Sequence, residues 1–443
     1  MILHPSIWSI FRVRGARMCV TLVSNLPATH LAECAISESE PLMRINRATS
    51  RLSFRRRRRR SGCLSTLMML IILGGVGVLT WRIIERRWSA PAAFPSGDSP
   101  SARLDAAQRL FDAGDLDGAV ERLRGGAAGA RGSDGSTTRL LARALVYRSY
   151  SDYDRAIDRD IAVQITTDAA RQRPNDADTL AAHAFALQAV GRTREAADVA
   201  ARVLESNPSH AFARTALALA YGGAGAHEAA LRESLRAAQT ATTADALDVL
   251  RAVAIGRADT GDYGEALRVV DQAVRAHPSI MALYFERALY ALQLGDADTA
   301  TVAYYDVLAR QPDNVKARLR LCELSSTMRE YEAALQHCTE VTERAPAWAE
   351  GWYQLGRENF LQGDFAAARD HLHRCSSLQV LQNVPIAERR FECWYLQGQA
   401  AQILGDCPAL LATYNEFRAM AADDTIHQTW TMPPEGPPGC TPE

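Results

Sequence analysis

The sequence predicts an all-α protein, in which a solenoid of antiparallel helix pairs is preceded by a single transmembrane helix. Two observations support this expectation. Alanine recurs every 34 residues, at Ala266, Ala300, Ala334 and Ala368. A fixed period of this size is typical of repeat proteins whose units bury their apolar faces by stacking on one another. In addition, residues 63–81 form a stretch of 19 residues without a charge.

Charge is distributed unevenly along the chain. Residues 1–101 hold 15 arginines and 5 acidic residues, a net charge of +10, so the rest of the chain carries −11. A basic segment of this kind typically faces an anionic surface. A run of six arginines at 55–60 closely precedes the apolar stretch, which indicates an orientation signal with contact to anionic lipid. No nucleic-acid partner is expected.

Residues 63–81 have the length of a membrane span. At about 1.5 Å per residue their helix would measure about 28 Å, close to the ~30 Å hydrocarbon core of a bilayer. Nine arginines lie between positions 44 and 60, against three between 82 and 87. The positive-inside rule therefore predicts a single-pass protein of a bacterial cell membrane, with its N-terminus in the cytoplasm and its repeat domain extracytoplasmic.

Two alternatives stay open at this end of the chain. The small residues at 90–93 could hold a signal-peptide cleavage site. An arginine-containing stretch separates them from the apolar run, which favours a retained anchor. Met43 could also be the true start codon. With a retained anchor, residues 1–62 are expected to form a basic, disordered cytoplasmic region.

Composition predicts the remaining domain organisation. Residues 89–101 are rich in Pro, Ala and Ser, as in a flexible linker. The repeat solenoid is predicted at 102–423, with a Gly/Ser-rich interruption at 125–138. The tail at 424–443 is rich in Pro and Gly and is expected to be disordered.

The clearest repeat unit has small and large residues at fixed places, namely Trp352, Leu355, Gly356, Gly363, Ala368 and Leu372. Small residues let two antiparallel helices approach closely, large ones fill the space between them, and glycine permits a tight turn. In its spacing, and partly in its residues, this unit resembles the tetratricopeptide repeat, a helix–turn–helix of about 34 residues. Nine candidate units align on the pattern, with a two-residue insertion near 242 and an eight-residue shift before Trp394.

The resemblance implies a right-handed superhelix with a concave channel lined by the first helix of each pair. Aromatic and basic residues at the inferred groove positions suit an extended peptide or a helix. Packing between repeats is the alternative for these positions. They are Phe212, Arg251, Phe285, Lys316, Tyr353, Arg357, Phe360 and Tyr395. Those tetratricopeptide domains that bind chaperone C-termini use several Lys and Asn residues in the groove. Lys316 is the only lysine of this chain, so that partner is disfavoured.

Six of the nine cysteines lie in the last 122 residues. Cys322 falls in a first helix and Cys338 in the second helix of the same unit, at places expected to face each other. If the domain lies outside the cytoplasm, oxidising conditions would favour a disulfide between them. Burial as small apolar residues is the alternative. Weaker candidate pairs are Cys375 with Cys393 and Cys407 with Cys440.

The sequence shows no pattern of catalytic residues. It has no Gly-rich phosphate loop, HExxH motif, nucleophile elbow or CxxC motif. His371, His373 and Cys375 share one helix, and His337 lies one repeat before His371. Equivalent residues of neighbouring repeats stand about 10 Å apart, too far for shared metal ligation. The chain is therefore expected to be non-enzymatic, with no catalytic site, metal, cofactor or small-molecule substrate.

These features together predict a membrane-tethered scaffold or adaptor that holds a protein or peptide partner in its groove. A non-catalytic accessory subunit of an envelope enzyme, or of a secretion or assembly machine, is the alternative. In both cases the anchor and linker keep the groove near the membrane.

Overall fold

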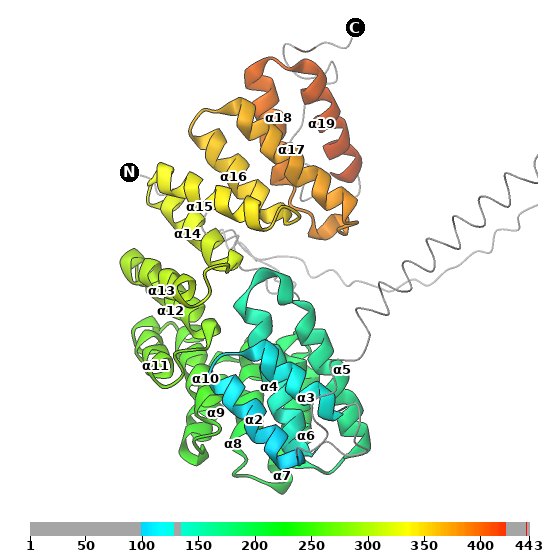
Figure 1. The fold of residues 1–443 in the computed structure, drawn as a ribbon, viewed down its shortest axis with the longest axis vertical. Coiled ribbons are helices and arrows are strands. Elements are labelled where there is room, and N and C mark those ends of the chain that lie inside the picture. Colours follow the sequence, from blue (N-terminus) through cyan, green and yellow to red (C-terminus); the bar gives the residue numbers. More distant parts are fainter. Residues whose placement is uncertain (1–98, 128–133, 422–439, 441–443) are drawn as a thin grey trace, which may run out of the picture. The chain divides into compact units, whose positions relative to one another are not determined.

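The computed structural model describes residues 99–127, 134–421 and 440. Within these residues, eighteen α-helices and two short 3-10 helices follow one another, and no strand occurs (Figure 1). The predicted transmembrane helix at 63–81, the linker up to residue 98 and nearly all of the tail lie outside the described residues. Among the helices that are described, none is both long and apolar enough to cross a bilayer.

The helices form nine antiparallel pairs in chain order, which confirms the expected all-helical repeat solenoid. The first helices of the pairs are α2 (Pro100–Asp112), α4 (Gly135–Ser151), α6 (Ala177–Ala189), α8 (Ala211–Gly223), α10 (Ala246–Asp259), α12 (Met281–Gln293), α14 (Val315–Thr327), α16 (Ala349–Leu361) and α18 (Glu392–Leu404). The second helices are α3 (Leu116–Ala127), α5 (Ile157–Gln172), α7 (Thr193–Ser206), α9 (His227–Thr240), α11 (Tyr263–Ala276), α13 (Ala297–Arg310), α15 (Tyr331–Arg344), α17 (Phe365–Leu381) and α19 (Cys407–Ala421).

The periodic alanines lie where helices approach one another most closely. All four of them, from Ala266 to Ala368, have no exposed surface, and each lies in the first half of a second helix. Gly356 on α16 has the same role, because a Cβ atom there would lie 2.6 Å from Cγ of Leu372 on α17. The 34-residue period therefore reflects close packing of helix pairs.

Glycine makes most turns within the pairs. Gly295 and Gly363 have φ angles of 77° and 83°, in the left-handed region that a residue without Cβ enters freely. Arg329 takes the equivalent place between α14 and α15 with φ at 63°. A left-handed conformation costs a residue with a Cβ atom about 1 kcal/mol, so this turn is the strained member of the series.

The hydrophobic core is continuous in the early units and divided later. One buried cluster extends from α2 to α12 and a separate one joins α16 to α19 around Trp394, with smaller clusters between them. We call α2–α13 the first block and α14–α19 the second block. Two of the smaller clusters join the blocks, because Ala317, Leu321 and Leu324 of α14 pack with residues of α12 and α13.

Candidate binding surface

The first helices of the first block meet on their concave side. Tyr147 on α4 donates a hydrogen bond to Oδ1 of Asp248 on α10 at 3.0 Å, and Nε of Arg143 lies 2.8 Å from Oδ2 of the same carboxylate. All three side chains are buried. Burial also raises the pKa of Tyr147, so its hydroxyl keeps the proton that it donates. The first block thus encloses α4 instead of presenting an open channel here.

Two predicted groove residues lie inside this closed region. Phe212 has no exposed surface, and the guanidinium of Arg139 lies 4.2 Å from its ring centroid. Arg251 is also buried; its Nε lies 2.6 Å from Oε1 of Glu286, and its guanidinium lies 4.9 Å from the ring centroid of Tyr150. The expectation that Phe212 and Arg251 line an open groove is therefore wrong, because residues of α4 occupy the space in front of them.

Phe285 and Lys316 are likewise used within the molecule. The Nζ atom of Lys316 lies 4.3 Å from the ring centroid of Phe285 and donates to the carbonyl of Tyr150 at 2.7 Å. Burial lowers the pKa of Lys316 to about 8. These contacts join α14 of the second block to the end of α4, so the partner of Lys316 is the chain itself.

Further contacts strengthen this junction. Asp152, the residue after α4, accepts from the backbone N–H of Lys316 at 3.0 Å and so caps α14. The Nδ2 atom of Asn314 donates to the carbonyl of Ser151 at 2.8 Å. Tyr153, in the 3-10 turn Tyr153–Arg155, stacks on Trp348 with ring centroids 4.4 Å apart. We call residues 150–153 and their partners at 314–316 and 348 the interblock clasp.

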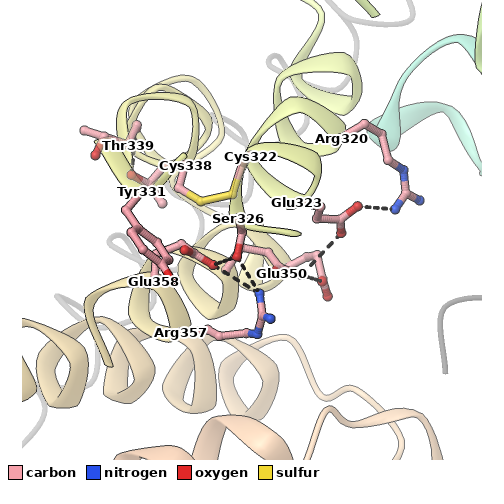
Figure 2. The surroundings of a disulfide bond; sticks show 12 residues. Arg320, Cys322, Glu323, Ser326, Tyr331, Cys338, Thr339, Glu350, Arg357 and Glu358 are labelled. Atoms are coloured by element: carbon pink, nitrogen blue, oxygen red, sulfur yellow. Dashed lines mark hydrogen bonds and ion pairs between the residues drawn. A yellow bond between two sulfur atoms is a disulfide. The ribbon is translucent and has the colours of Figure 1, made fainter. Parts of the chain in front are cut away.

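The first helices of the second block carry a row of polar side chains that reach solvent. Arg320 and Glu323 of α14 pair at 2.6 Å, and Nε2 of Gln354 donates to Glu323 at 3.3 Å and to Glu350 at 3.1 Å. Arg390 pairs with Glu350 at 2.8 Å. Figure 2 shows Arg320, Glu323 and Glu350 on one side of these helices. We call these five residues the charged row; its four charged side chains are 18–38% exposed.

Aromatic groups accompany the charged row. The guanidinium of Arg390 lies 4.4 Å from the ring centroid of Tyr353, and Tyr395 on α18 is 40% exposed. Phe360 packs against Phe365 instead, with ring centroids 5.3 Å apart. Of these predicted groove residues, Tyr353 is therefore buried beneath Arg390, Tyr395 is exposed, and Phe360 contributes to the packing of its own pair.

Arg390 was not among the predicted residues. It follows the 3-10 turn Ile386–Glu388, inside the eight-residue departure from the repeat period. Residues that are one repeat period apart in the sequence lie at the same place in successive units. An inserted residue has no such counterpart in other units, so its place in the fold cannot be inferred from the period. The irregular spacing before Trp394 is the only sequence signal that could have pointed to it.

Arg357 and Glu358 form a smaller polar site beside the charged row. Glu358 has no exposed surface, and its Oε1 accepts from Ser326 Oγ at 2.5 Å and from Arg357 Nη1 at 3.1 Å. Its other oxygen has no hydrogen-bond partner among the described residues. Burial raises the pKa of Glu358. The side chain of Arg357 is 37% exposed and is the part of this site that a partner could contact (Figure 2).

All six cysteines of the described residues are paired in disulfides. Cys322 and Cys338 join α14 to α15 with Cα atoms 5.2 Å apart (Figure 2), as the repeat register suggested. The other pairs are Cys375–Cys393 and Cys407–Cys440, with Cα atoms 6.0 and 5.3 Å apart. Every disulfide lies in the second block or between it and the tail. In the described part of the chain, no three His, Cys, Asp or Glu residues gather as metal ligands would.

Comparison with known families agrees with this architecture. Residues 254–316 and 291–357 each match a family model of the tetratricopeptide repeat. These segments are tetratricopeptide repeats. Tetratricopeptide repeats typically form non-catalytic scaffolds for protein–protein interaction, and neither match indicates a catalytic family. No curated protein matches the chain.

Several solved structures are similar to this chain in fold. The APC/C hetero-tetramer Cut9–Hcn1 is 14% identical with a TM-score of 0.49; the match covers 74% of this chain but only 62% of that chain, less than two thirds of its length. The C-terminal part of a TPR repeat-containing protein from Cytophaga hutchinsonii is 14% identical with a TM-score of 0.45, over 55% of this chain and 96% of that one. YrrB, a TPR protein with an unusual peptide-binding site, is 17% identical with a TM-score of 0.32, over 43% of this chain and 97% of its own.

Proposed function

We propose that this chain is a membrane-tethered scaffold whose second block binds a protein or peptide partner along the charged row. The contrast between the two blocks carries this proposal. The first block closes its inner face with buried contacts such as Tyr147–Asp248, whereas Arg390 and Tyr395 in the second block are 38% and 40% exposed. Arginine and tyrosine are the residue types that most often supply binding energy at interfaces.

The chemistry of the charged row indicates a partner with both charged and apolar groups. Arg320 and Arg390 already hold Glu323 and Glu350, so an incoming segment would add to or exchange these ion pairs. The exposed ring of Tyr395 on α18 offers an apolar surface in the same block, while Tyr353 is buried beneath Arg390 and supports it. An extended peptide or a helix crossing α14, α16 and α18 would use both kinds of contact.

The tether and its orientation are the second part of the proposal. Residues 63–81 would anchor the chain, with the repeats on the extracytoplasmic side. The three disulfides of the second block support this placement, because cytosolic thiols are normally kept reduced. Anchoring would also raise the effective concentration of the binding surface near membrane partners.

Site-specific photo-crosslinking in native membranes tests this function. A photoreactive phenylalanine analogue replaces Tyr395 in the full chain, and the same analogue at Val302, which is 54% exposed on α13, is the matched control. We expect a discrete adduct from position 395 and none from 302, and the additional change Arg390→Ala should reduce it. Equal labelling from both positions, or none from 395, would contradict the proposed surface. A stoichiometric enzyme in the adduct would identify the chain as an accessory subunit.

A further inference from the structure

The turns between the paired helices carry a second exposed feature, separate from the charged row. Leu294, Met328, Leu361 and Leu404 lie at the C-terminal ends of α12, α14, α16 and α18. Their exposed fractions are 50%, 39%, 55% and 43%. We call these four residues the turn ridge. Single exposed apolar side chains are ordinary, but here one recurs at the turn of four successive units. Leu294, Met328 and Leu404 each directly precede the left-handed residue of their turn, and Leu361 lies one residue earlier, because Gln362 holds that place.

The turn ridge is not a general property of these repeats. Thr260 and Ala224 occupy the place of Leu294 in the two preceding units. Large apolar side chains at this place or next to it therefore begin at the end of the first block and continue through the second. Since a turn of this type accepts a small or polar residue there, packing within the fold does not require the leucines.

Contacts between neighbouring units show that their turns are adjacent. Nε2 of Gln362, beside Leu361, donates to the carbonyl of Tyr331, which follows the preceding turn, at 3.4 Å. Arg369 of α17 pairs with Asp406, in the next turn, at 2.8 Å. Tyr331 itself is 41% exposed and adds to the apolar surface. The turns that join α14 to α15, α16 to α17 and α18 to α19 therefore follow one another along one edge of the second block.

Carboxylates accompany the apolar side chains. Asp296, Glu330 and Asp364 each lie two or three residues after a member of the turn ridge and are exposed. No basic side chain of the described residues forms an ion pair with any of the three. Hydrogen bonds from Thr299 lower the pKa of Asp296, so that carboxylate is ionised at neutral pH. Arg329, in the turn between α14 and α15, is the one basic residue at the turns that carry these three carboxylates.

We infer that the turn ridge docks a basic amphipathic helix of a partner protein, independently of any ligand on the charged row. Leucine side chains would receive the apolar face of that helix, and the carboxylates would pair with its Lys or Arg residues. Neighbouring units place packed helices about 10 Å apart, so four units span about 30 Å, which a helix of about 20 residues covers. The exposed apolar side chains and the carboxylates lie at the same turns. They therefore favour a basic amphipathic helix over an acidic one, whose carboxylates would be repelled.

Peptide binding to the full chain tests the inference. The chain is reconstituted in nanodiscs of zwitterionic lipid, and the probe is a labelled amphipathic helix of about 20 residues composed of Leu and Lys. Fluorescence anisotropy measures its Kd, with empty nanodiscs as the background. We expect saturable binding that Leu361→Ser with Leu404→Ser weakens by about tenfold. Asp296→Asn with Asp364→Asn should remove most of the salt dependence, because Asn keeps the helix caps and loses the charge.

Matched variants separate this surface from others. Val302→Ser removes an exposed apolar side chain from α13, outside the turn ridge, and Tyr395→Ala alters the charged-row side of the second block. Both should bind the probe as the unchanged chain does. Equal Kd values for the Leu361→Ser/Leu404→Ser variant and the unchanged chain would overturn the inference. The inference would also be overturned if the full chain self-associates and the Leu361→Ser/Leu404→Ser variant does not. That result would show that the turn ridge binds a second copy of the chain.

Discussion

Lys316 and Tyr150 are 166 residues apart in the chain, yet the Nζ of Lys316 donates to the Tyr150 carbonyl at 2.7 Å. This bond lies where the hydrophobic core is divided. Polar contacts of the interblock clasp therefore supplement the chain connection from α13 to α14. These bonds act together with the apolar contacts that Ala317, Leu321 and Leu324 of α14 make with α12 and α13.

Replacing Lys316 with Met should change how stability depends on pH. Burial lowers the pKa of Lys316 to about 8, while an unfolded lysine has a pKa of about 10.4. Between these values the unfolded state binds more protons, so the native chain should gain stability as pH rises, relative to Lys316→Met. Urea unfolding of both chains at pH values near 8 and 10 measures this difference. Parallel pH profiles would show that the buried ammonium is not titrating in this way.

Glu358→Gln should stabilise the chain at neutral pH by about 1 kcal/mol. Burial raises the pKa of Glu358, so its ionised form is disfavoured in the folded state, whereas Gln still accepts from Ser326. The native glutamate takes up its proton as pH falls, so the gain should shrink toward about pH 4.3, the unfolded value. Denaturant midpoints at a series of pH values check this. A destabilised variant at pH 7 would mean that the Arg357 pair outweighs desolvation.

Gly356→Ala should destabilise the second block by about 1–3 kcal/mol. A Cβ atom at this position would lie 2.6 Å from Leu372 Cγ and 3.1 Å from the Leu372 backbone nitrogen, so the two helices must separate. Gly264→Ala is the matched control, because nothing lies within 4 Å of its added Cβ. Thermal unfolding compares the variants. The interpretation fails if both alanines leave the melting temperature unchanged.

Removing the Cys322–Cys338 disulfide should cost about 3 kcal/mol, the value for a closed loop of about 15 residues. The two cysteines are separated by 16 positions, and the paired change Cys322→Ser with Cys338→Ser avoids a free thiol. Hydrogen exchange should report the loss in α14 and α15 and leave α6 and α8 protected. Alkylation of the denatured, unreduced chain gives a separate check, since reactive thiols at 322 or 338 would show that the bond does not form.

Repeat spacing is sufficient to predict the helix pairs and their contacts. The alanine period identifies residues that are buried where two helices approach, because only a small side chain fits at that place in every unit. The same register brings Cys322 opposite Cys338, since both positions face inward within one pair. Both results depend only on the order of small and large residues within one helix pair, which the sequence of that pair specifies.

Exposure of the groove positions could not be predicted in the same way. Phe212 and Tyr395 both fall on first helices at groove positions, yet Phe212 is fully buried and Tyr395 is 40% exposed. The difference arises because α4 packs against the inner side of the first block, and no repeat period encodes a contact between distant units. The position of Arg390 could not be predicted for a related reason, since this residue belongs to an insertion outside the repeat period.

The sequence by itself therefore determined the helix–turn–helix unit, the buried alanines and the facing positions of Cys322 and Cys338, because each depends on neighbours less than about one repeat away. Only the tertiary structure decided that the first block is closed, that Lys316 binds the end of α4 and that the charged row stays open. The first two features depend on contacts across more than 100 residues, such as Tyr147 with Asp248. Small rotations between successive repeats accumulate over such distances, and they determine which surfaces meet.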